Sequence, residues 1–172
     1  ALPGVKLFYA LKSLSHPELV KRLKKLGCNF DLATIGEVEL VESLGITGDQ
    51  CIHTHPIKKD KEIKRALEFG NTRFVVDNIE EMKKFYKYAG QVELIIRVSF
   101  RSKQAVVDLS RKFGCTLEEL PVLVEMAQSN GVSVVGLSFH VGSQSLSPMM
   151  QVNAIRSSIA AMKVMNLSLI HI

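Results

Sequence analysis

The chain has 172 residues, of which 47% are hydrophobic and 23% charged, and a formal net charge of +5. This balance predicts one soluble, folded domain with a core of its own and argues against a disordered chain. The lysines are scattered over expected helical faces without interleaved aromatic residues, which indicates a solvated surface and not a nucleic-acid interface.

Three cysteines, Cys28, Cys51 and Cys115, lie far apart along the chain. They are odd in number and lack the C-x-x-C spacing, so we expect free thiols, no disulfide framework and a reducing, cytoplasmic location. No apolar run approaches the roughly 20 residues of a membrane helix, and the first residues lack a basic region followed by an apolar stretch. We therefore expect neither a membrane partner nor a signal peptide.

Short β-rich runs alternate with amphipathic helical segments along the chain. The expected strands cover residues 5–11, 28–33, 51–55, 73–77, 92–99 and 134–141. The expected helices cover residues 16–26, 35–44, 58–69, 79–89, 117–129 and 148–165, and most of them are closed by a glycine. The stretch 100–116, between the fifth strand and the next helix, is polar.

This alternation gives about six βα units and predicts right-handed crossovers around a parallel sheet. An open doubly wound sheet and a (β/α)₈ TIM barrel both fit. The first strand is not followed by Gly-x-Gly-x-x-Gly, and the repeat runs without domain-breaking linkers, so we favour the barrel. A whole barrel has eight units, and six therefore predict a partial one.

Polar or ionisable residues stand where almost every expected strand ends. They are Lys12, Asp31, His53, His55, Asp77, Arg97 and the group around His140. Lys12 is the least expected of them, because it directly follows an apolar run that resembles a buried strand. The carboxyl ends of the strands carry the chemistry of a parallel barrel, so this pattern predicts a functional site at that edge.

Six segments then occur in an order and spacing that point to one family: FYALKSL, FDLAT, RFVVDNIEEM, IIRVSF, LSRKFG and GLSFHVGSQ. Together they resemble the pyridoxal-phosphate-dependent decarboxylases of the ornithine/diaminopimelate/arginine group, whose barrel is shared with alanine racemase. The resemblance covers about residues 5–165. Within the family, SKQAVVDLSRKFG is most similar to the ornithine decarboxylase branch.

The resemblance implies roles for four residues at the strand ends. Lys12 would form the Schiff base with pyridoxal phosphate, which requires an amine that is neutral part of the time. His140 would stack on the face of the pyridine ring, Gly142 would let the backbone approach the phosphate, and Ser143 would bind the phosphate by a hydrogen bond. The plainer alternatives are a rim lysine, a core histidine and a capping turn.

Four charged residues also correspond to family positions. Asp31, Glu37 and Arg97 match residues around the lysine and the ring, and Lys112 lies where a mobile loop of the family meets the partner subunit. Salt-bridged rim residues, and an exposed loop lysine, remain open as the alternative reading of these four.

A second pattern, His53-Thr54-His55, is a possible half of a zinc site if both imidazoles share one face of a strand. No third ligand is evident, so we expect no metal. At positions 54–56 the chain reads Thr-His-Pro, where the family usually reads Ala-Asn-Pro, and this departure leaves the local hydrogen bonding open.

The implied activity of the parent protein is decarboxylation of a small amino acid, ornithine first, to putrescine and carbon dioxide, by a homodimer. Residues 1–165 are expected to form the partial cofactor-binding barrel, and 166–172 a tail of doubtful origin. The C-terminal β-domain, the glycine-rich phosphate loop, the acid that pairs with the pyridine nitrogen and a catalytic cysteine are expected outside this chain. The alternatives are a non-catalytic relative like the antizyme inhibitors, a diaminopimelate or arginine decarboxylase, a racemase on the same barrel, and an unrelated (β/α)₈ enzyme.

Overall fold

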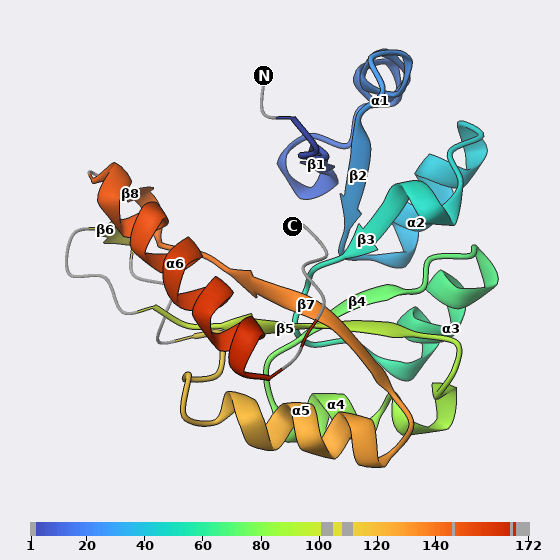
Figure 1. Cartoon of the computed structure of the whole chain (residues 1–172). Helices are drawn as coiled ribbons and strands as arrows, with labels where there is room; N and C mark the ends of the chain where they lie inside the picture. Colours follow the sequence, from blue (N-terminus) through green and yellow to red (C-terminus); the bar gives the residue numbers. More distant parts are fainter. Residues whose placement is uncertain (1–2, 101–104, 108–111, 146, 166, 168–172) are drawn as a thin grey trace. The chain divides into compact units, whose positions relative to one another are not determined.

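The computed structural model describes residues 3–100, 105–107, 112–145, 147–165 and 167. Six strands form a parallel sheet in the order β1-β2-β3-β4-β5-β7, and a second sheet pairs β6 with β8 (Figure 1). The chain divides within β4 into two compact units, Ala1–Phe74 and Val75–Ile170, which are described in turn.

The first unit alternates strands and helices in the predicted order. Its elements are β1 (Phe8–Ala10), the 3₁₀ turn η1 (Leu11–Ser13), α1 (Pro17–Lys25), β2 (Asn29–Leu32), α2 (Ile35–Ser43), η2 (Gly48–Gln50), β3 (Cys51–His53), α3 (Asp60–Glu68) and the start of β4 (Arg73–Val76). Apolar side chains of both strands and helices meet in its core, among them Phe30 and Leu32 from β2, and Val38 and Val41 from α2.

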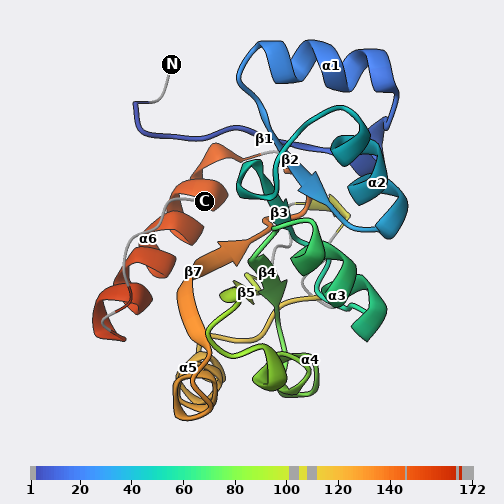
Figure 2. The same cartoon turned by 90° about the vertical axis from the view of Figure 1, so that its right-hand side faces the viewer.

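Side chains fix the helix ends of this unit. The Lys24 ammonium donates to the carbonyls of Leu44 and Gly45, where α2 has ended. Arg65 of α3 is paired with Glu42 of α2, and Figure 2 shows these two helices side by side. The helices that follow β2 and β3 are therefore held to each other as well as to their strands.

The second unit carries the end of β4 and the rest of the chain. Its elements are α4 (Ile79–Lys83), η3 (Tyr86–Tyr88), β5 (Glu93–Val98), β6 (Ala105–Val107), α5 (Leu120–Ser129), β7 (Ser133–Phe139), β8 (Ser143–Ser145) and α6 (Pro148–Val164). Strands β5 and β7 are parallel, with Arg97 opposite Ser138 (Figure 1). None of the helices in the described ranges is long and apolar enough to cross a membrane.

Two expectations, about the helix over 79–89 and the polar stretch 100–116, are corrected. The helix expected over 79–89 is divided into α4 and the 3₁₀ turn η3, and Phe85, between the two, is buried. The polar stretch 100–116 contains β6, which pairs antiparallel with β8. Each of these two strands has only three residues, too few for a periodic sequence signal.

The first strand is also shorter and less buried than expected. It ends at Ala10, all of its residues are half-buried, and Leu7 before it is 72% exposed. It is the outermost strand of the sheet, with β2 as its neighbour. Lys12 therefore lies in the turn after the strand and not on the strand itself.

Candidate functional site

The first unit presents Lys12 at the carboxyl end of β1. Its side chain is exposed, and it belongs to the one-turn helix η1. Ala10, the last residue of β1, is paired with Asp31 of β2, so the two strand ends lie next to each other. The ammonium of Lys12 acts on the carboxylate of Asp31 electrostatically. The structure thus brings the expected lysine and one expected carboxylate together.

The Asp31 carboxylate is held by two hydrogen bonds from the neighbouring strand end. Thr54 donates its backbone N–H to Oδ1 over 3.2 Å and its hydroxyl to Oδ2 over 2.8 Å. Burial raises the pKa of Asp31, while the Thr54 bonds and the charge of Lys12 oppose that rise and the charge of Glu37 adds to it. Sequence reasoning missed Thr54, although the departure from the family pattern at this position was a signal.

Glu37 lies close to this pair but has a structural task. Its Oε2 accepts the backbone N–H of Ala33 at 2.6 Å and that of Thr34 at 3.2 Å. The Thr34 hydroxyl in turn accepts the N–H of Glu37, which completes a capping box at the start of α2. The capping box is by itself a sufficient reason for a glutamate at position 37, and no bound ligand is needed to explain it.

Arg97 lies in the second unit, on β5. Its guanidinium is 5.2 Å from the centre of the Phe113 ring, a cation–π contact. Burial lowers the pKa of Arg97, and the charge of Asp77 opposes that change. Asp77 is itself buried and accepts the backbone N–H of Gly114 at 2.9 Å. The sequence prediction gave Asp77 no role, and the structure makes it the anion beside Arg97.

The histidine expected to contact the cofactor follows β7. The side chain of His140 is exposed, and its Nδ1 accepts the backbone N–H of Gly142 at 2.9 Å. Gly142 has a φ of 97°, a conformation that favours glycine. Ser143 begins β8, and its side chain lies outside the described residues, as does the tail 166–172 apart from Leu167. Lys112 is exposed in the turn before Phe113.

The alternative of a zinc site at His53 and His55 required both imidazoles on one face of a strand, and the structure does not place them so. β3 ends at His53, whose side chain is 1% exposed, whereas His55 is exposed in the following turn. Across the described ranges, no group of three His, Cys, Asp or Glu side chains is arranged to hold a metal ion.

Burial and the nearby Lys58 and His55 lower the pKa of His53 to about 3. The unfolded chain binds a proton at this histidine below about pH 6.5 and the folded chain does not, so acid favours unfolding. We predict that His53→Met makes the unfolding free energy less dependent on pH between about pH 6.5 and pH 4. Urea unfolding across that range measures the slope. A slope in His53→Met equal to that of wild type would contradict this prediction.

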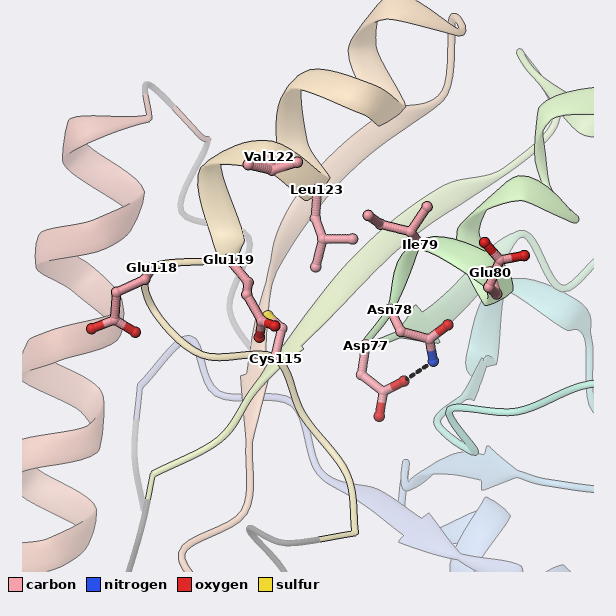
Figure 3. A pocket seen from close by; sticks show the side chains of 9 residues that line it. All are labelled: Asp77, Asn78, Ile79, Glu80, Cys115, Glu118, Glu119, Val122 and Leu123. Carbon is pink, nitrogen blue, oxygen red and sulfur yellow. Dashed lines mark hydrogen bonds between the residues drawn. The ribbon is translucent and has the colours of Figure 1, made fainter.

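A cavity of about 410 Å³ lies in the second unit between the starts of α4 and α5 (Figure 3). Its apolar wall is formed by Ile79, Val122 and Leu123. The carboxylates on its rim are engaged: Glu80 pairs with Lys83, Glu119 accepts the Thr116 N–H, and Asp77 accepts from Asn78. No residue predicted to bind the cofactor lines this cavity.

The three cysteines are all free and buried. Burial is the main cause that raises the pKa of Cys51, and likewise that of Cys115, to about 12. Because the thiolate is the reactive form, burial disfavours reaction at these two residues.

Residues 1–169 match the family model described as "Pyridoxal-dependent decarboxylase, pyridoxal binding domain". Among curated proteins, a lysine/ornithine decarboxylase of Selenomonas ruminantium is 39% identical over 146 residues, which are 85% of this chain and 37% of that protein. Among solved structures, the lysine/ornithine decarboxylase of Vibrio vulnificus complexed with putrescine is 47% identical, with a TM-score of 0.85, over 94% of this chain and 42% of that chain.

Other matches carry different names. Antizyme inhibitor 2 of Xenopus laevis is 38% identical over 143 residues, 83% of this chain and 31% of that protein. The arginine decarboxylase of Paramecium bursaria Chlorella virus is 31% identical, with a TM-score of 0.89, over 94% of this chain and 44% of that chain. This chain therefore spans less than half the length of these relatives. The structural likeness confirms the predicted fold class, a partial (β/α)₈ barrel.

Proposed function

We propose, from the premise that this chain belongs to the family of pyridoxal-dependent decarboxylases as their pyridoxal-binding domain, that the protein carrying it decarboxylates ornithine, with lysine as the second substrate. The observation that carries the proposal is Lys12, an exposed primary amine beside the Asp31 carboxylate at the carboxyl end of two parallel strands. The family and its cofactor are those that the sequence predicted.

The donor set of the chain fits pyridoxal phosphate. An aldehyde needs an accessible primary amine, which Lys12 offers, and an aromatic ring needs a flat, exposed partner, which the imidazole of His140 offers. The glycine at a φ of 97° two residues later has no side chain to obstruct a close approach to the backbone. When bound, the cofactor supplies an electron sink for the pair of electrons left behind by the departing carboxylate.

Each residue of this chain then has a proposed task. Lys12 would hold the cofactor through its primary amine. Asp31 faces the released lysine and receives its ammonium as an ion pair. His140 would orient the ring plane, and Arg97, whose charged form Asp77 favours, contributes a positive charge in its own unit. Ser143 and Lys112 keep their proposed contacts with phosphate and with the partner subunit of a homodimer.

A non-catalytic binding protein is the second candidate, because antizyme inhibitor 2 is among the matches. The two candidates differ in what they require of Lys12, since an inhibitor of this kind needs no amine for chemistry. Three buried free thiols support the proposed cytoplasmic location of either one.

Substrate choice is tested by carbon dioxide release from ornithine, lysine, arginine and diaminopimelate, with the whole protein that carries this chain. We expect the largest kcat/KM for ornithine and the next largest for lysine, which is one methylene longer and in a pocket of fixed length costs about 10- to 200-fold. Greater activity on arginine or diaminopimelate would contradict the substrate proposal. Absence of release from all four would favour the non-catalytic candidate.

A further inference from the structure

We propose that Thr54 is a positioning residue, whose hydroxyl keeps the Asp31 carboxylate ionised and in a fixed orientation beside Lys12. This inference rests on the proposed function of Lys12. It assigns a task to a side chain that is outside the set of residues expected to touch the cofactor.

The geometry of the two bonds fixes the carboxylate. Asp31 is paired with Ile52 across β2 and β3, and Thr54 follows two residues later, just beyond the end of β3. Each carboxylate oxygen receives one donor from Thr54, the N–H at Oδ1 and the hydroxyl at Oδ2. Rotation of the carboxylate would break both bonds, so its orientation is set by Thr54.

The turn that carries Thr54 is itself held in place. The ammonium of Lys58, which is 1% exposed, donates to the carbonyls of His55 at 2.8 Å and Pro56 at 3.1 Å. Nδ1 of His55 also lies 2.6 Å from the carbonyl oxygen of Ile57. Because the residues after Thr54 are bonded to one another, the threonine is presented to Asp31 from a fixed support.

The groups around Asp31 determine its pKa, and the Thr54 hydroxyl opposes those that raise it. The groups that face this carboxyl are Lys12 from the turn after β1, Glu37 from α2, and the neutral Thr54 from the end of β3. Burial and Glu37 raise the pKa of Asp31, whereas Thr54 and Lys12 lower it. Removal of the hydroxyl therefore raises this pKa further, and the carboxyl becomes neutral at a pH where it was charged.

Loss of the negative charge on Asp31 also affects Lys12. A neutral Asp31 no longer attracts the ammonium that forms when the amine is released, so the lysine loses its partner. An alanine at position 54 would keep the backbone donor and lose the hydroxyl. The departure from the Ala-Asn-Pro pattern of the family thus adds one hydrogen bond at the site.

The test compares Thr54→Val, which removes the hydroxyl at nearly constant volume, with Thr54→Ser, which keeps it. The first readout is the carboxyl titration of Asp31 by ¹³C NMR in the whole protein without cofactor, with the signal assigned through Asp31→Asn. We expect the midpoint to move up by about one pH unit in Thr54→Val and to stay within about 0.3 unit of wild type in Thr54→Ser. The acid limb of the kcat/KM profile should move in the same direction.

Two results would overturn the inference. One is a folded Thr54→Val protein with an unchanged Asp31 midpoint, and the other is a Thr54→Ser protein that shifts as far as Thr54→Val. Thr54→Ala replaces the valine variant if that protein does not fold. Failure of the proposed function has a different signature, which is wild-type protein from which borohydride traps no pyridoxyl group on Lys12.

Discussion

Replacement of Lys12 by alanine is expected to abolish retention of pyridoxal phosphate through gel filtration and to lower kcat for carbon dioxide release by at least about 10³-fold. The reason is that the amine is the proposed covalent attachment point, and the exposed turn at the end of β1 offers no other lysine. Protein stability should change little, since an exposed side chain is removed. Absorbance of the eluted protein and a carbon dioxide assay give the two measurements.

Lys6→Ala is the matched control, because Lys6 is an exposed lysine of the same unit outside the strand end. It should retain cofactor and activity at wild-type levels. If Lys12→Ala retained the cofactor as well as Lys6→Ala does, the attachment point would lie elsewhere. If activity survived in that variant, the chemical role of Lys12 would be wrong.

Gly48→Ala is expected to reduce the free energy of unfolding by about 3 kcal/mol or more. Gly48 is buried at the start of the turn before β3, and a Cβ placed there would overlap the backbone of Gly70 and Asn71. Backbone atoms cannot rotate out of the way as a side chain can, so the turns before β3 and β4 would have to separate. Urea or thermal unfolding of the whole protein measures the loss.

Gly36→Ala is the control, and we expect it to change the free energy of unfolding in the opposite direction. Gly36 lies in the first turn of α2, exposed, and a Cβ there would meet no atom within 4 Å. Alanine is the better helix former, so this variant should gain up to about 1 kcal/mol. Equal stability of the two alanine variants would refute the close backbone contact at Gly48.

The sequence alone predicts most of the order of strands and helices. The reason is that apolar residues at helical spacing, and glycines at the helix ends, recur along the chain. The helix expected over 35–44 is α2 almost residue for residue, since apolar spacing and capping residues are local signals. The pair β6 and β8 was missed because it joins positions far apart in the chain, Ala105 with Ser145. Such a contact leaves no pattern in either segment alone.

Site residues could be predicted where a charged residue stands at the end of a strand. They were harder to predict where a residue of the neighbouring strand determines the charge or orientation of that side chain. Lys12 and Asp31 were expected together, and they are together. The exposure of Lys12 was not expected, because an apolar run does not reveal that its strand lies at a sheet edge. The bonds of Thr54 to Asp31 depend on the register of β2 and β3, which only the folded chain fixes.

Reduction of the cofactor-loaded whole protein with borohydride, followed by peptide mapping with mass spectrometry, identifies the lysine that binds the cofactor. We expect one pyridoxyl group on the peptide that contains Lys12. A pyridoxyl group on any other lysine, with the Lys12 peptide unmodified, would contradict this expectation.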